Sequence, residues 1–427
     1  MRKVLIITYY WPPAGGPGVQ RILKFVKYLP QLGWQPVVLT VKNGNYPALD
    51  EILTAEIPRE AEVFKTFSLE PFALYNLIKG KKPDSNIPTH ILSSSEKDTL
   101  IQKLFKWIRV NLFLPDARIG WIPFMIKKGK QLIREYQPDV IFSCSPPHSL
   151  QLGAAELSRC SGIPFVCDLR DPWTEAFWLK SLNRNPLSWV IDRRWERNTL
   201  KQTNYITTVS NGFKEIYSKI TTSPILVIPN GFDDIDFKNV IKSRNSKFTI
   251  CHTGNIRTVQ FAQEFFDSID ALPKEILDNL EVNLFGNVHF QIKEYIESSK
   301  AHDCYHFHGY VSHERVIQEI VNADMLVVFS TNTPNSAGIQ TAKLFEYLIT
   351  GNFIIAYGTE GNEMKDTLDE TECGAFYIFG ESCEKDILKL YALWLNDALP
   401  HYGNDLVSKY SRKNQTKELV TLFEKLL

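Results

Sequence analysis

A glycine-rich turn near the amino terminus has the residue types needed to hold a phosphate group. The turn lies in "YYWPPAGGPGVQR", where Gly15, Gly16 and Gly18 precede a predicted helix that begins near Val19. Glycines allow backbone N–H groups to approach an anion closely, and the positive end of the helix dipole adds favourable charge. The turn lacks the GxGxxG spacing, and Pro17 removes one donor. It predicts phosphate or acceptor contact, with a purely structural turn as the alternative.

A second turn, in "HTGNIRTVQ", repeats this arrangement later in the chain. A predicted buried strand ends at Gly254, Asn255 follows, and Arg257 lies in the loop or in the first turn of the next helix. A guanidinium can hold a diphosphate through a forked pair of hydrogen bonds. This turn therefore predicts a diphosphate contact at Arg257, and the alternative is an ordinary surface arginine.

The stretch "SAGIQTAKLFEYLITGNFIIA" combines small residues, a helix and a buried strand. Gly338 and its small neighbours permit close approach of a ligand, and the helix is predicted to start near Ile339 or Gln340. Free N–H groups and the positive end of its dipole would point at that ligand. Lys343 and Glu346 are three residues apart and share one helical face. They predict a polar binding face, and a helical salt pair is the alternative.

These residues must be positioned by an α/β framework, because short apolar runs alternate with helical stretches along the chain. Ligands of such sheets bind beyond the carboxyl ends of the strands. The fold class is therefore α/β with two doubly wound, Rossmann-like domains facing across one cleft. We predict an N-terminal domain over residues 1–224, joined by residues 405–427 as a returning C-terminal helix, and a C-terminal domain over 225–404. The predicted strands are residues 3–8, 36–40, 139–144, 164–169 and 205–210, then 248–254, 281–286, 304–309, 324–330 and 352–358.

Composition restricts the class of protein. The chain has 427 residues, 44% of them hydrophobic and 22% charged, with 48 basic and 48 acidic residues. This balance indicates a soluble globular protein and argues against nucleic acid as a partner. The seven cysteines are scattered without a close CxxC pair, which favours reduced thiols in the cytoplasm and disfavours a zinc site. The sequence predicts no signal peptide and no membrane-spanning segment.

Residues 101–134 are locally basic and rich in aromatic side chains. The pattern predicts an amphipathic helix that could lie on an anionic membrane surface, and an ordinary surface helix is the alternative. Its apolar face is formed by Leu104, Phe105, Ile108 and Leu112, and its basic residues are Lys103, Lys106, Arg109, Lys127, Lys128, Lys130 and Arg134.

Several of these motifs together resemble a known enzyme family. The glycine-rich loop, "IPNGFD", "TGNIR", "FHGYVSHERVIQEIVNADMLVVFS" and "KLFEYLITGNFIIA" resemble, in order and spacing, the retaining nucleotide-sugar-dependent glycosyltransferases of family 4, which have the GT-B fold. The segments "FVCDLRDPW" and "LPDARIGWIPF" resemble the branch that assembles bacterial surface polysaccharides. The resemblance implies a sugar donor bound mainly by the C-terminal domain, a glycan or lipid-linked acceptor bound mainly by the N-terminal domain, and a diphosphate held without a metal or other cofactor.

The resemblance also implies roles for individual residues. Glu346 corresponds to the second acid of the family's E-x7-E element and would accept hydrogen bonds from the ribose, and Arg257 would clamp the diphosphate. The loop from Gly309 through Tyr310 and Val311 to Ser312 resembles the loop that cradles the base. The backbone amides of Ile339 and Gln340 would face the donor.

The chain departs from the family pattern in the donor motifs. The first acid of E-x7-E is replaced by Gly338, so other groups must select the sugar. The family's lysine after the Gly-Arg loop has no match, because Gln260 stands nearby. Lys343 could replace the missing charge.

The acceptor side departs as well. Where many family members have a histidine after an N-domain strand, this chain has "DLRD", Asp168 to Asp171. Either aspartate could contact the acceptor or the reacting sugar, and His148 in "SPPHSL" is a further candidate after another strand. Capping or turn roles are the alternatives for all three.

The predicted function is retaining transfer of a sugar from a UDP- or GDP-type donor to a hydroxyl, in polysaccharide or lipopolysaccharide biosynthesis at the inner face of the plasma membrane. Arg257, Lys343 and the helix start would stabilise the leaving diphosphate. Two alternatives stay open: a sugar-nucleotide 2-epimerase, and a non-catalytic sugar-nucleotide-binding partner of an assembly complex. Asp234-Ile-Asp236 is formally a DxD metal motif, but its place after an Asn-Gly turn favours a linker role.

Overall fold

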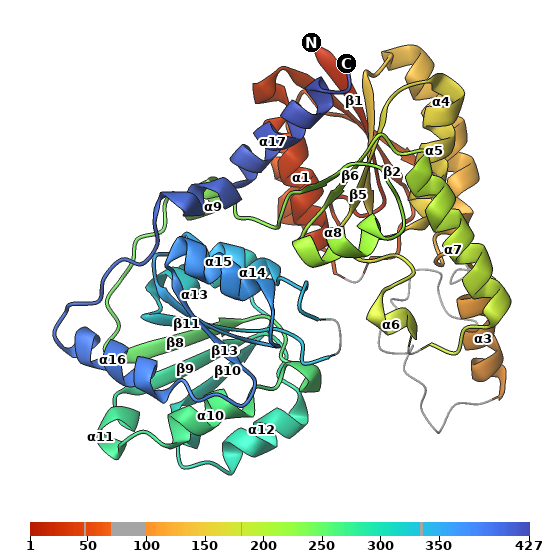
Figure 1. Cartoon of the computed structure of the whole chain (residues 1–427). Helices are drawn as coiled ribbons and strands as arrows, with labels where there is room; N and C mark the ends of the chain where they lie inside the picture. The colour runs from red at the N-terminus through yellow and green to blue at the C-terminus, as the bar shows by residue number, and fades with distance from the viewer. Residues whose placement is uncertain (47, 70–99, 181, 334–335) are drawn as a thin grey trace. The chain divides into compact units, whose positions relative to one another are not determined.

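The computed structural model describes the whole chain except residues 47, 70–99, 181 and 334–335 (Figure 1). The chain divides into two compact units, Met1–Pro229 with Gln415–Leu427, and Asn230–Asn414. The first change of unit lies a few residues after the predicted boundary at 224. The reason is that residues 225–227, predicted to lie in the second domain, form a strand that pairs with the sheet of the first unit. The chain returns to the first unit at Gln415, ten residues after the predicted position 405.

The first unit is built on a seven-stranded sheet in the order β3-β2-β1-β4-β5-β6-β7, and its recorded strand pairs are parallel. Its central strands carry apolar runs such as "VLII" because both of their faces are covered. The sequence analysis predicted the five central strands and missed the two at the sheet's edges. The strands are β1 Arg2–Thr8, β2 Trp34–Val41, β3 Glu62–Thr66, β4 Val140–Ser145, β5 Phe165–Leu169, β6 Tyr205–Thr208 and β7 Ile225–Val227.

Helices cover both faces of this first sheet. On one face, α1 and the returning C-terminal helix α17 pack against the sheet, and Phe423 of α17 lies 5.2 Å from Trp34 and 5.7 Å from Phe142 between ring centroids. On the other face lie α4, α5 and α7 (Figure 1). The α-helices are α1 Pro17–Tyr28, α3 Leu100–Asn111, α4 Ile122–Tyr136, α5 Ser149–Ser161, α6 Phe177–Lys180, α7 Pro186–Lys201, α8 Asn211–Ser218 and α17 Arg412–Glu424.

The second unit repeats this plan with a six-stranded sheet in the order β10-β9-β8-β11-β12-β13. Helices α10, α12 and α16 cover one face, and α13, α14 and α15 cover the other. The strands are β8 Phe248–Thr253, β9 Leu280–Phe285, β10 Tyr305–Gly309, β11 Met325–Phe329, β12 Phe353–Gly358 and β13 Gly374–Ile378. The α-helices are α9 Asp234–Phe237, α10 Gln263–Asp270, α11 Lys274–Leu277, α12 Phe290–Glu297, α13 His313–Asn322, α14 Ala342–Leu348, α15 Glu363–Thr371 and α16 Glu384–Leu395.

Both sheets reverse their strand order once, between β1 and β4 in the first unit and between β8 and β11 in the second. In open parallel sheets, ligands bind at this switch point, outside the carboxyl ends of the strands. The predicted α/β fold with two doubly wound domains is confirmed. Each unit therefore has one sheet edge at which its site residues should gather.

The basic segment 101–134 spans α3 and α4. The side chain of Asn111, at the end of α3, accepts a hydrogen bond from the Asn185 N–H at 2.7 Å and so ties α3 to the start of α7. Trp107 and Leu112 are exposed, whereas the side chains of Leu104, Phe105 and Lys106 lie outside the described residues. Within the described part of the chain, no helix combines the length and the apolar character needed to cross a bilayer. Contact with a membrane surface stays a prediction.

Candidate active site

Three glycines lie at the carboxyl ends of three neighbouring strands, β8, β9 and β10, in the second unit. Gly254, Gly286 and Gly309 have φ angles of +92°, +106° and +67°, a region that favours glycine. The Gly254 N–H donates to the Phe285 carbonyl at 2.6 Å, and the Gly286 N–H donates to the Gly309 carbonyl at 2.6 Å. A Cβ at Gly286 would lie 2.6 Å from the Gly254 carbonyl carbon. The edge is therefore a close-packed backbone surface without side chains. The sequence analysis named Gly254 and Gly309 and missed Gly286, which also ends a predicted strand.

Lys343 of α14 lies against this edge. A Cβ at Gly254 would overlap Lys343 Cε and Nζ, so the ammonium occupies the space that the glycine leaves open. Burial of the ammonium lowers the pKa of Lys343 to about 8, the nearby Glu346 carboxylate opposes the shift, and Arg257 adds to it. The structure thus brings together Gly254, Arg257, Lys343 and Glu346, four residues that the sequence analysis assigned to the donor.

We expect Gly254→Ala to displace the Lys343 ammonium. The new methyl group meets only the flexible end of a lysine, so the chain should still fold, at a cost of about 1–2 kcal/mol for a left-handed alanine. Activity should fall nearly as far as in Lys343→Met, and the double variant should be little worse than either single one. Steady-state kinetics and thermal melting measure both effects. Full additivity of the two losses in activity would contradict this arrangement.

Glu346 pairs with a histidine that directly follows the loop proposed to cradle the base. His313 Nε2 lies 3.2 Å from Glu346 Oε1, and both side chains are partly exposed. His313 is the first residue of α13, and Ser312 caps that helix by accepting from the Arg315 N–H. Tyr310 is 84% exposed, so its ring is open to a ligand. The sequence analysis missed His313, although it directly follows the loop from Gly309 to Ser312.

The start of the donor helix differs from the prediction. Helix α14 begins at Ala342, so Ile339 and Gln340 lie in the preceding turn and not at the helix start. This turn is fixed by side-chain bonds instead: Gln340 Nε2 donates to the Glu363 carbonyl at 3.2 Å, and Asn362 Nδ2 donates to the Ser336 carbonyl at 3.3 Å. The turn that contains Gly338 is therefore held by the first residues of α15.

Helix α14 is also held to the end of β8 by a buried tyrosine. The Tyr347 hydroxyl accepts a hydrogen bond from the Thr253 N–H at 2.8 Å and lies 2.9 Å from the Thr253 Oγ1. Next to it, His252 Nδ1 lies 2.9 Å from the Val327 carbonyl. Burial, together with the charge of Lys343, holds the pKa of His252 well below its usual range, so this ring is neutral. These contacts fix the position of Lys343 relative to Gly254.

The glycine turn of the first unit lies at the carboxyl edge of β1. Gly16 has a φ of +98° and caps α1, with open space where its Cβ would be. A Cβ at Gly18 would lie 3.0 Å from both terminal nitrogens of Arg170, whose Nε donates to the Ser145 carbonyl at 2.9 Å. Gly15 donates its N–H to the Ala48 carbonyl. Arg170, which the sequence analysis did not single out, therefore brings a guanidinium to this turn.

His148 and Asp171 lie at the same edge of the first sheet. The His148 ring stacks on Trp173 at 5.3 Å between centroids. Burial, with a contribution from Arg170, lowers the pKa of His148 to about 3, so the ring is neutral at physiological pH. Burial raises the pKa of Asp171 above its usual value, although Arg170 opposes this shift. A carboxylate with a raised pKa is a better proton acceptor than an ordinary aspartate.

Asp168 lies in the core of the first unit and does not reach a ligand. Its carboxylate is 0% exposed and accepts hydrogen bonds from Arg21 Nε at 3.2 Å, Arg21 Nη2 at 3.0 Å and Thr207 Oγ1 at 2.7 Å. Arg21 Nη1 in turn donates to the carbonyl of Pro229, the last residue of the unit before the chain leaves it. The structure thus assigns Asp168 a structural role and separates it from Asp171.

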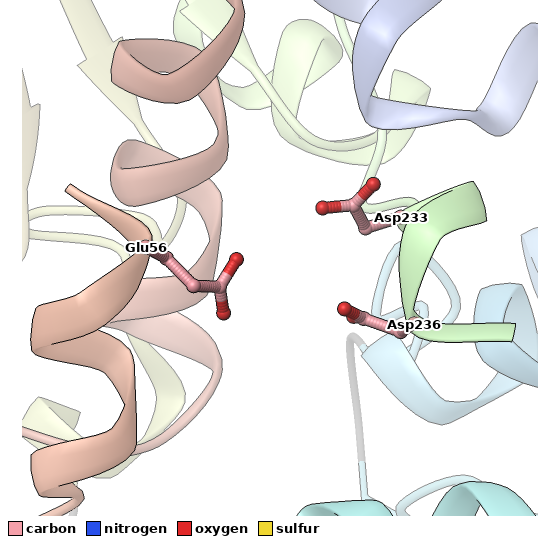
Figure 2. Close-up of side chains that lie close together, drawn as sticks. All are labelled: Glu56, Asp233 and Asp236. Atoms are coloured by element: carbon pink, nitrogen blue, oxygen red, sulfur yellow. The ribbon is translucent and has the colours of Figure 1, made fainter. Parts of the chain in front are cut away.

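The formal DxD motif lies at the start of α9. Figure 2 shows Asp236 on this short helix and Asp233 directly before it, where Asp233 caps the helix by accepting from the Ile235 N–H at 3.3 Å. Glu56, also labelled there, belongs to the first unit, where it binds two lysines of α1 at 2.6 and 2.9 Å. Among the described residues, no three potential metal ligands of one unit lie close enough together to share an ion. The capping role of Asp233 supports the linker interpretation of this segment.

Comparisons with known proteins agree with this geometry. Residues 18–235 match the family model described as Glycosyltransferase Family 4. A search of curated proteins finds no match. Among solved structures, Anabaena HepE in complex with UDP superposes with a TM-score of 0.59 at 12% identity over 100% of both chains. The lipopolysaccharide outer core galactosyltransferase WaaB superposes with a TM-score of 0.56 at 13% identity, again over 100% of both chains.

A further solved structure, S. aureus TarM in complex with UDP and alpha-GlcNAc-glycerol, superposes with a TM-score of 0.60 at 11% identity, covering 99% of this chain and 100% of TarM. At these identities the superpositions establish the GT-B fold alone, whereas the family model spans more than half of the sequence. The protein is therefore a glycosyltransferase, and it belongs to glycosyltransferase family 4.

Proposed function

We propose that the protein transfers a sugar from a nucleoside diphosphate sugar to a hydroxyl group of a glycan or lipid-linked acceptor, with retention at the anomeric carbon. The observation that carries this proposal is the placement of Lys343 against Gly254, at a sheet edge that also presents Arg257 and Glu346. A cation beside glycines of positive φ suits a diphosphate, and a carboxylate on the same helix suits ribose hydroxyls.

In the second unit, three sets of residues would hold the diphosphate, the ribose and the base of the donor. Arg257 and Lys343 bind the diphosphate, Glu346 with His313 faces the ribose, and the loop after Gly309 covers the base. Binding of a dianion next to Lys343 stabilises its charged form, so a nucleotide should raise the lowered pKa of this lysine. UDP or GDP is the proposed nucleotide. HepE and TarM, which were solved with UDP, support a donor of this kind.

The difficult charge in this reaction develops on the leaving diphosphate. As the bond from the anomeric carbon to the diphosphate oxygen breaks, negative charge grows on that oxygen next to Lys343 and Arg257. Fixed cations at this place stabilise the transition state more than the ground state. The new bond forms to the acceptor oxygen, and the proton of that hydroxyl would pass to the leaving diphosphate oxygen. These groups would act without a metal or another cofactor.

The first unit would hold the acceptor at the edge formed by the Gly15–Gly18 turn, His148 and Asp171. Arg170 and the start of α1 can bind an anionic group of the acceptor, such as the phosphate of a lipid carrier. Asp171, with its raised pKa, is the group proposed to contact the acceptor hydroxyl. The WaaB neighbour supports a role in lipopolysaccharide or surface-polysaccharide synthesis. Such a role would place the protein in the cytoplasm, with 101–134 against the inner face of the plasma membrane.

A thermal-shift screen tests the donor. UDP-, GDP-, ADP- and dTDP-sugars are added in turn, and one nucleotide class should raise the melting temperature by several degrees, because a ligand at 100 times its Kd stabilises by about 2.7 kcal/mol. The shift should survive added chelator. Product analysis by NMR then reads the anomeric configuration, and inversion would contradict retention. A donor converted to its 2-epimer without any acceptor would instead support the epimerase.

A further inference from the structure

A cavity lies in the second unit, at the sheet edge opposite to the donor residues. It has a volume of about 430 Å³ and is lined by residues that precede β11 and β12, including Asp324 and Asn352, and by the end of α16. Strand β11 has five residues, which places roughly 16 Å between this edge and the donor edge. The volume falls within the range of about 300–1,000 Å³ that is usual for small-molecule sites.

One wall of this cavity is aromatic. Phe353 and Tyr402 line it with their rings 4.9 Å apart in an edge-to-face arrangement, and Trp394 adds a third ring. Trp394 is only 8% exposed, and its buried indole N–H has no hydrogen-bond partner among the described residues. Buried polar groups are normally paired. Because the indole nitrogen is itself buried, Trp394 contributes its ring and not a hydrogen bond to a ligand in the cavity.

Other residues that line the cavity carry charges of both signs. Lys242 Nζ donates to Asn352 Oδ1 at 2.6 Å, and an ammonium has three such donors. Arg244 pairs with Asp397 at 2.9 Å, and Asp324 accepts from the Thr249 N–H at 2.9 Å. Two cations therefore stand beside two carboxylates, which suits a ligand that both donates and accepts hydrogen bonds better than it suits a phosphate.

The walls are held in place by the backbone. Gly351 has a φ of +72°, and a Cβ there would overlap the His401 ring, so the segment after α16 packs directly on this glycine. The Tyr402 N–H donates to the Gly351 carbonyl at 2.8 Å. Asn352 Nδ2 donates to the Ile320 carbonyl at 2.7 Å, which leaves its oxygen for Lys242. The cavity is thus formed before any ligand arrives.

We propose that this cavity binds one pyranose residue of a glycan, at a site separate from the donor site. Aromatic rings pack against the apolar face of a sugar ring, while the charged groups meet its hydroxyls, each of which donates and accepts. A glycan held here would stay concentrated near the enzyme between transfers. The proposal concerns binding alone and does not depend on which nucleotide the other edge of the sheet takes.

The nine tryptophans of the chain give nine indole N–H signals in a nitrogen-15 NMR spectrum, and Trp394→Phe identifies the one from the cavity. The intact protein is titrated with neutral probes, the methyl glycosides of glucose, galactose, mannose and N-acetylglucosamine, and separately with inorganic phosphate. We expect the Trp394 signal to move to saturation with at least one glycoside and to stay fixed with phosphate.

Two variants at the cavity rim and one control test whether the glycoside binds in the cavity. Lys242→Ala and Tyr402→Ala should each weaken glycoside binding by about tenfold, the loss expected for a removed charged hydrogen bond or ring contact. Lys274→Ala, an exposed lysine that pairs with Asp278 on α11, should bind as the unaltered protein does. Lack of response to all four glycosides, a response to phosphate instead, or unchanged binding in both rim variants would overturn the proposal. Nucleotide binding at the donor edge is measured separately, so either result can fail without the other.

Discussion

Lys343→Met should lower kcat by about 10²–10³-fold, the loss measured when an enzyme loses a hydrogen-bond donor to an anion that develops in the transition state. Methionine keeps the length and flexibility of the side chain and removes only the charge. Because the ammonium is already costly to bury, as its pKa of about 8 shows, the variant should melt no lower than the unaltered protein. Kinetics with the donor found in the thermal-shift screen, together with thermal melting, measure both effects.

The pH dependence of donor affinity shows whether Lys343 acts through its charge or through its packing. Above pH 8 the unaltered protein should lose affinity for the nucleotide sugar. In the unliganded protein Lys343 is then increasingly neutral, and it must take up a proton before it can bind the diphosphate. Lys343→Met should lack this decline. Lys365→Met, at an exposed lysine of α15 paired with Asp369, is the matched control and should leave both turnover and its pH profile unchanged. Unchanged turnover in Lys343→Met would remove this lysine from the site.

Asp168→Asn should destabilise the protein by about 3–5 kcal/mol, because it leaves the Arg21 guanidinium buried without its counter-charge. Both side chains of this pair are 0% exposed. The first unit should therefore unfold at a clearly lower denaturant concentration. Asp278→Asn is the control, since it breaks an exposed ion pair with Lys274 and should cost less than about 1 kcal/mol.

The stabilising effect of Asp168 should also depend on pH. Burial alone raises the pKa of this carboxyl, but the charge and hydrogen bonds of Arg21 outweigh burial and lower it below its ordinary value of 3.8. The unfolded chain therefore binds this proton more readily than the folded one. The stabilisation is complete above the unfolded pKa and is lost as the pH falls through the folded pKa. If Asp168→Asn matched the unaltered protein at neutral pH, the buried pair would not have the structural role assigned to it.

Much of the fold was predictable because buried parallel strands leave a local pattern. Apolar runs such as those ending at Thr8 and Thr253 lie between turns and helices, and they became central strands of the two sheets. The edge strands β3, β7 and β13 were missed, because most of their residues are only partly buried and their apolar runs are short. Because β7 was missed, the predicted domain boundary at 224 lies before this strand.

The site was less predictable, because its contacts join residues far apart in the chain. Gly254 and Lys343 are individually visible in the sequence, but only the fold places one against the other. Arg170 lies between Asp168 and Asp171, the two residues that the sequence suggested as candidates. No local pattern shows that the Arg170 guanidinium reaches Gly18. Conversely, Asp168 and Asp171 look equivalent in "DLRD". Asp168 lies within strand β5, whose residues are all buried, whereas Asp171 lies in the loop beyond the strand.

A crystal structure with the nucleoside diphosphate selected by the thermal-shift screen tests the central claim most directly. The diphosphate should lie within hydrogen-bond distance of Lys343 Nζ and the Arg257 guanidinium, beside Gly254, with a ribose hydroxyl on the Glu346 carboxylate. The base should contact the loop that begins at Gly309. A nucleotide bound at the glycine turn of the first unit, or one whose phosphates lie away from Lys343, would contradict the assignment of the second unit as the donor site.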